Sequence, residues 1–157
     1  MTDKKSNQNI IITRDESSIH RMKFYIIRNY QTSKDKMDPK LKYVYNYEII
    51  DSIRNLDKRY YDSLITGFND KINFRQDDFF NKCIFRPQFL LMPNDTVCYI
   101  VSTTTCQKMQ FVNLITNDMV TKEVTTGNYI ETLIEKILSQ KKQMEFNSNK
   151  NKLDTLK

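Results

Sequence analysis

The C-terminal third of the chain limits the fold more than any other part of the sequence. Two strand-like runs, Thr96–Cys106 and Lys108–Thr116, are followed by a third, Met119–Thr125. An amphipathic helix is then predicted over Asn128–Lys142, and Asn128 is its candidate N-cap. A strand meander that ends in one helix is an arrangement that small β-barrels use to dock onto partner subunits.

The N-terminal two-thirds of the chain predicts further strands and one earlier helix. Apolar and polar residues alternate from Leu41 to Ile49, which is the period of a strand. Apolar residues then recur at three- and four-residue steps, so a helix is predicted over Asp51–Phe68, with Asp51 as its N-cap. We expect a disordered N-terminus over 1–8, one domain over 9–142 and a disordered basic tail over 143–157.

The composition argues against catalysis, metal binding and membrane insertion. Phosphate-binding loops need glycines, and the only two, Gly67 and Gly127, are not in such a motif. His20 is the only histidine, so neither a catalytic triad nor a structural zinc site is expected. The three cysteines are expected to be reduced, buried thiols in an intracellular protein. No apolar run approaches the roughly 20 residues of a membrane span, and we expect no cofactor and no small-molecule substrate.

The last predicted helix has an unusually wide apolar surface. At about 100° per residue, two apolar rows share the helix, and together they cover about 180° of its circumference. The rows contain Tyr129, Leu133 and Ile137, and Ile130, Ile134 and Leu138. One half of this arc can pack on the sheet, and the other half would mark a partner-binding surface unless it is covered. The alternative is a helix that lies in a groove of its own fold.

Basic and aromatic residues interleave in Arg21–Tyr30 and Lys40–Tyr47, in a chain of net charge +6. Single-strand nucleic-acid binders use this mixture, because aromatic rings stack bases at about 1–3 kcal/mol each and cations follow the phosphates. The same tyrosines could instead pack in a core or form a protein interface. The candidate nucleic-acid contacts are Lys23, Arg28, Lys42 and Tyr43.

The order of predicted elements resembles the oligonucleotide/oligosaccharide-binding (OB) barrel. The run TVCYIVSTTTCQKMQFVNLITNDMVTKEVTTGNYIETLIEKILSQKKQ is similar to the end of the smallest OB-fold subunit of the telomere CST complex, as in a ciliate telomerase holoenzyme. The replication protein A small subunit is a more distant relative. The resemblance implies a mainly β fold with helices: a five-stranded OB barrel with an inserted helix over 51–68 and a C-terminal helix over 128–142.

The resemblance also implies a function. A member of this family is a non-enzymatic accessory subunit in the nucleus, at the telomeric chromosome region. Its C-terminal helix docks onto a larger OB-fold subunit, and the complex supports single-stranded telomeric DNA binding and complementary-strand synthesis. By position, the implied partner-binding residues are Tyr129, Ile130, Leu133, Ile134 and Ile137.

Two other classes compete with this interpretation. One is an α+β protein-interaction module of roadblock or longin type, which would serve trafficking or motor assembly. The other is a small metal-dependent nuclease, but the adjacent acids Asp77 and Asp78 would point to opposite faces of an extended strand. The fold separates the OB-fold class from the roadblock or longin class, because an OB barrel closes its strands whereas a longin sheet stays open.

Overall fold

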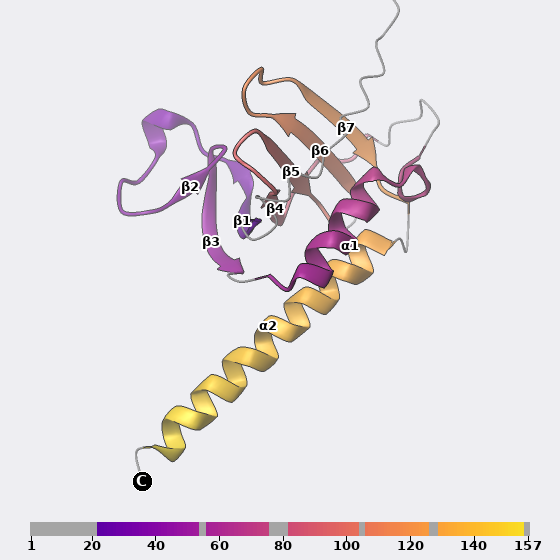
Figure 1. Cartoon of the computed structure of the whole chain (residues 1–157). Helices are drawn as coiled ribbons and strands as arrows, with labels where there is room; N and C mark the ends of the chain where they lie inside the picture. Colours follow the sequence, from indigo (N-terminus) through magenta and orange to yellow (C-terminus); the bar gives the residue numbers. More distant parts are fainter. Residues whose placement is uncertain (1–21, 54–55, 76–81, 104–105, 126–128, 156–157) are drawn as a thin grey trace, which may run out of the picture.

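The computed structural model describes residues 22–53, 56–75, 82–103, 106–125 and 129–155. Its strands form one seven-stranded antiparallel sheet with the order β2-β3-β1-β4-β5-β6-β7 (Figure 1). The strands are β1 (Lys23–Gln31), β2 (Tyr43–Val44), β3 (Tyr47–Ile53), β4 (Phe89–Met92), β5 (Val97–Val101), β6 (Lys108–Asn113) and β7 (Met119–Glu123). The helices are α1 (Lys58–Asn69), α2 (Tyr129–Asp154) and the short 3-10 helices η2 (Lys34–Lys36) and η3 (Lys71–Asn73).

The sheet is open. Strands β2 and β7 lie at its two edges, and no ladder between described strands joins them. A barrel requires its first and last strands to pair. The mainly β fold with a C-terminal helix is therefore confirmed, whereas the five-stranded barrel is not.

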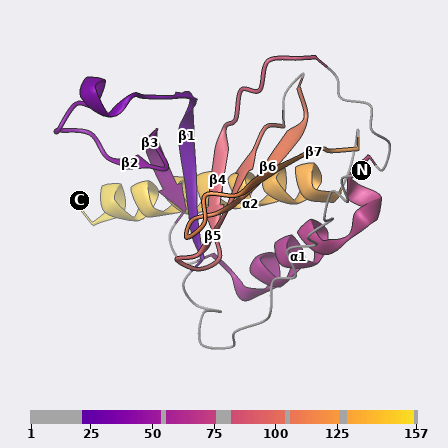
Figure 2. The same cartoon turned by 90° about the horizontal axis from the view of Figure 1, so that it is seen from above.

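Both α-helices lie on the same face of the sheet (Figure 2). Antiparallel meanders commonly bury one face against helices, and the large residues of this face alternate along the strands. The core beneath the helices includes Phe24 of β1, Leu91 of β4, Tyr99 of β5 and Phe111 of β6. The opposite face has a smaller buried cluster: Ile27, Tyr47, Leu90, Cys98, Ile100 and Val112.

The alternating run 41–49 is a hairpin rather than one strand. Tyr45 and Asn46 have φ angles of 46° and 64°, which is the left-handed geometry of a two-residue hairpin turn. Val44 pairs with Tyr47 across this turn, so β2 and β3 run antiparallel. The alternation predicted the extended backbone correctly, but it did not show the reversal. No glycine marks the turn, and a bulky residue such as Tyr45 rarely adopts a positive φ.

The first long helix begins later than predicted. Residues Asp51–Ile53 belong to β3, where Ile53 pairs with Phe24 of β1. The N-cap is Asp57, whose side chain accepts a hydrogen bond from the Arg59 amide at 2.8 Å. Apolar spacing alone could not place the boundary, because it continues unbroken from the strand into the helix.

The C-terminal helix is longer than predicted. It continues to Asp154 instead of ending at Lys142, so most of the tail expected to be disordered is helical. The predicted cap Asn128 lies outside the described residues, as do the predicted disordered N-terminus over 1–8 and the start of the domain at residue 9.

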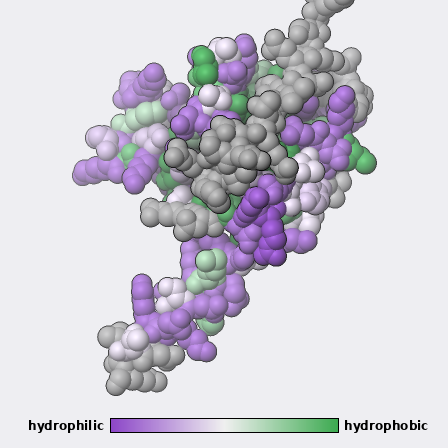
Figure 3. Space-filling view, in the orientation of Figure 1, coloured by the Kyte–Doolittle hydropathy of each residue, from purple (hydrophilic) through white to green (hydrophobic). Residues whose placement is uncertain are grey.

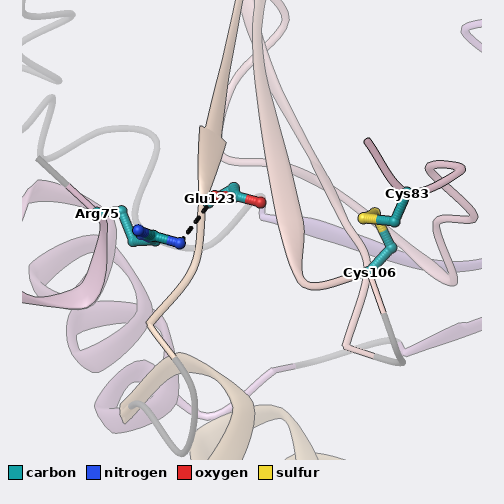
Figure 4. The surroundings of a disulfide bond; sticks show 4 residues. All are labelled: Arg75, Cys83, Cys106 and Glu123. Carbon is teal, nitrogen blue, oxygen red and sulfur yellow. Dashed lines mark ion pairs between the residues drawn. A yellow bond between two sulfur atoms is a disulfide. The ribbon is translucent and has the colours of Figure 1, made fainter. Parts of the chain in front are cut away.

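A disulfide joins Cys83 to Cys106, with a Cα–Cα distance of 5.7 Å (Figure 4). The expectation of reduced thiols is therefore wrong for these two residues. They lie 23 residues apart, on either side of the β4–β5 hairpin, and the fold brings them together. Cys98 is a free, buried thiol, and burial raises its pKa to about 12.

An ion pair lies near the disulfide. Figure 4 shows that Arg75 points toward Glu123 at the end of β7, and their charged atoms are 3.7 Å apart.

Candidate docking surface on the helical layer

Four of the five predicted partner-binding residues are buried in the chain's own core. Ile130, Leu133, Ile134 and Ile137 are each at most 5% exposed. Tyr129 is different, with 49% of its surface exposed. The expectation that half of the apolar arc stays uncovered is therefore wrong for these four side chains.

Helix α1 covers the part of the arc that the sheet leaves open. A Cβ built on Gly67 would lie 3.1 Å from Tyr129 Cδ1 and 3.2 Å from Ile130 Cγ1, so the α1 backbone touches the start of α2. The absence of a side chain at Gly67 permits this approach. Leu64 and Phe68 of α1 lie in the same buried cluster as the apolar side chains of α2. This packing agrees with the alternative considered from the sequence, a helix that is covered by its own fold, and α1 is the element that covers it.

A groove lies between the two helices. It has a volume of about 290 Å³. Seven residues line it: Arg59, Tyr60 and Ser63 from α1, and Tyr129, Thr132, Leu133 and Lys136 from α2. The α2 residues are spaced by three or four positions and so share one helix face. Buried Leu133 forms the apolar floor, while Arg59 and Lys136 are exposed cations at the rim.

Helix α2 leaves the body of the protein after Lys141. The ammonium of Lys141 bonds Asp51 of β3 at 2.6 Å and also contacts Glu145 one turn further along α2. The hydrogen bond from Lys141, followed by that from the Ser52 amide, lowers the pKa of Asp51. We call residues 142–154 the arm. All of its side chains described between Lys142 and Leu153 are exposed. The arm projects away from the sheet (Figure 1), and its surface is mainly hydrophilic (Figure 3).

Three large apolar side chains are exposed on the arm: Met144, Phe146 and Leu153. Phe146 and Leu153 are about 65% exposed each and lie two helical turns apart, so they share one face. Met144 lies two turns after buried Ile137 and continues that row beyond the body. The sequence signal for this surface was present, but the Asn- and Lys-rich composition of the tail indicated disorder instead.

The four candidate nucleic-acid residues are only partly brought together. Lys23 and Lys42 line one shallow hollow of about 340 Å³ beside β1 and β3. Tyr43 is half-buried, and its hydroxyl accepts a hydrogen bond from the Asp38 amide at 3.2 Å. Arg28 is paired with Glu48 at 3.1 Å, and Lys23 lies 3.7 Å from Asp95. Because two of the three cations have a carboxylate partner, the local positive charge is smaller than the sequence suggested.

Two tyrosines of the segment 40–47, Tyr45 and Tyr47, pack against the protein's own side chains. Tyr47 is buried in the cluster on the helix-free face, and burial raises its pKa to about 12. Tyr45 occupies the hairpin turn and packs against the same cluster. The hairpin thus uses these aromatic rings mainly for packing, which was the alternative considered from the sequence.

Comparison with known proteins found no matching family model, no matching curated protein and no matching solved structure. Over the described ranges, no three His, Cys, Asp or Glu side chains gather in a group that could hold a metal ion. Neither α1 nor α2, as far as each is described, is long and apolar enough to cross a membrane.

Proposed function

We propose that this chain is a non-enzymatic interaction subunit that docks onto a larger protein through its helical layer, with the arm as the main contact. The observation that carries the proposal is the contrast within α2. Its first half is part of the core, whereas the described side chains from Lys142 to Leu153 are exposed. A helical surface of about three turns is thereby held away from the sheet, in a position that a partner can reach.

The arm contains little that would keep it helical by itself. Isolated helices shorter than about 12–15 residues are marginal in water, and asparagine and serine are poor helix formers. Among the described side chains of this part of α2, the pairs are Lys141–Glu145 and Gln143–Asn147, and such pairs contribute only about 0.2–0.5 kcal/mol each. Burial of Phe146 and Leu153 against another protein would add about 1.5–3 kcal/mol for each fully buried side chain, so a partner would stabilise the arm.

The more specific assignments stay predictions. The CST-type subunit, with its closed OB barrel, larger OB-fold partner and telomeric single-stranded DNA, is one of them. The α+β interaction module of roadblock or longin type is the other, and the open sheet favours it. The nuclear location implied by the CST resemblance is disfavoured by the Cys83–Cys106 disulfide, because disulfides are rare in reducing compartments.

The test is co-purification of the tagged full chain from its native source, with the partner identified by mass spectrometry. In the variant Phe146→Glu/Leu153→Glu we expect the partner to be lost, because two exposed apolar contacts become charges. The matched control is Ile72→Glu/Ile115→Glu, which changes two isoleucines that are at least as exposed and that belong to neither α1 nor α2. Equal recovery of the partner by both double variants would contradict the proposal.

A further inference from the structure

The groove between α1 and α2 combines an apolar floor with a positively charged rim. Leu133 is buried at the floor, and the rings of Tyr60 and Tyr129 line the sides. Tyrosine supplies both apolar contact area and a polar hydroxyl, and for that reason it is enriched at protein interfaces. Such a lining can bind an apolar side chain, while the polar groups at its edge orient the segment to which that side chain belongs.

The size of the groove decides which kind of ligand it can hold. Small-molecule and cofactor sites are usually about 300–1,000 Å³ and enclose most of their ligand. This groove, at about 290 Å³, is slightly smaller than that range. It can hold one large side chain of a bound segment, with the rest of the segment lying across the rim.

The positive charge at the rim favours acidic residues on either side of that apolar side chain. Lys136 is exposed and has no ion-pair partner among the described residues. Arg59 already pairs with Asp57, the N-cap of α1, at 3.1 Å, so its charge is partly neutralised. Lys136 is therefore the principal cation available to a ligand. It belongs to the same helix as the basic residues Lys142, Lys150 and Lys152 of the arm.

We propose that the groove binds an acidic segment of the partner protein, with one large apolar side chain of that segment seated on Leu133 between Tyr60 and Tyr129. Carboxylates on either side of that apolar residue pair with Lys136 and with Arg59. This inference rests on the proposed docking function and specifies the chemistry of the partner.

The experiment measures binding of a fluorescein-labelled short peptide, with a central phenylalanine flanked by glutamates, to the full-length chain by anisotropy. We expect saturable binding that weakens as salt increases, because exposed charges are screened. Lys136→Glu should weaken binding by about tenfold, since it reverses the principal rim charge. The control Lys150→Glu, on the arm of the same helix, should change affinity by less than about twofold.

Two further probes separate the two parts of the site. A peptide with alanine in place of phenylalanine should bind at least about tenfold more weakly if the groove holds an apolar side chain. The variant Tyr129→Ala should weaken the phenylalanine peptide and leave the alanine peptide unchanged. Circular dichroism of each variant checks that the fold is intact.

Three results would overturn the inference: no saturable binding, equal losses in Lys136→Glu and Lys150→Glu, or displacement of the peptide by a single-stranded oligonucleotide at a lower concentration than by unlabelled peptide. The docking function has its own readout in Phe146→Glu/Leu153→Glu. If that variant loses the partner while the peptide fails to bind the groove, the partner docks on the arm and the acidic-segment inference alone is wrong.

Discussion

The two halves of α2 have the same backbone geometry but different surroundings. Between Ile130 and Ile137 the apolar row is covered by the sheet and α1, whereas beyond Lys142 the described side chains face solvent. The first half is held by tertiary packing, which normally provides most of a helix's stability. The second half lacks that packing. The comparison indicates that the first half serves the fold and that the arm serves an interaction.

The largest expected difference between the two halves is the cost of removing an apolar side chain. Ile134 is 1% exposed, so Ile134→Ala should lower the free energy of unfolding by about 2–5 kcal/mol through lost burial and cavity formation. Met144 is 65% exposed, so Met144→Ala should change it by less than about 0.5 kcal/mol. Urea denaturation of both variants measures the two values. Similar losses of unfolding free energy in the two variants would contradict the distinction between a packed first half and an exposed arm.

The disulfide should stabilise the body and leave the arm unaffected. Closing the loop between Cys83 and Cys106 contributes about 3 kcal/mol in the chain-entropy model. We therefore expect Cys83→Ala/Cys106→Ala to reduce the free energy of unfolding by about that amount. Amide exchange over residues 142–154 should stay at the wild-type rate, because no described contact of the arm reaches either cysteine. Slower or faster exchange of the arm in this variant would show that arm and body are coupled.

The ion pair at the junction between the two halves should make the smallest contribution to the free energy of unfolding, and that contribution should depend on pH. Lys141 lowers the pKa of Asp51, and Asp51, followed by Glu145, raises the pKa of Lys141. The pair's contribution is present above the ordinary carboxyl pKa and is lost as pH falls through the lowered pKa of Asp51. It is also lost at high pH, as Lys141 titrates at its raised pKa. Asp51 is half exposed, so Asp51→Asn should cost no more than about 1 kcal/mol at neutral pH.

Glu145→Gln is the matched control for Asp51→Asn, because Glu145 contacts the same ammonium from within the helix. We expect a smaller loss for Glu145→Gln, since it breaks no link between α2 and the sheet. Thermal unfolding at pH 7 and at acidic pH compares the two variants. A loss for Asp51→Asn that remains undiminished in acid would contradict this account of the junction.

The sequence predicted the order of elements in the C-terminal third well. Strands β5, β6 and β7 and the start of α2 follow the apolar patterns, because each pattern there has one period and clear turn residues. The predictions failed where a boundary depends on a tertiary partner. Pairing with β1 extends β3 through Ile53, although the apolar spacing there suits a helix.

The candidate site was harder to predict than the fold. The apolar residues of α2 were identified correctly, but which of them stay exposed depends on α1, whose approach at Gly67 cannot be read from either helix alone. The groove residues Arg59, Tyr60 and Lys136 were missed for the same reason, because they belong to two helices that are distant in sequence. The disulfide likewise depends on a long-range contact.

Hydrogen exchange along α2 tests the central claim most directly. Amides over 130–138 should be protected in the free chain to nearly the global stability, whereas amides over 142–154 should exchange rapidly. In the purified complex the arm should become protected, and the first half should change little. Equal protection of both halves in the free chain, or an arm that still exchanges rapidly in the complex, would contradict the assignment of the arm as the docking surface.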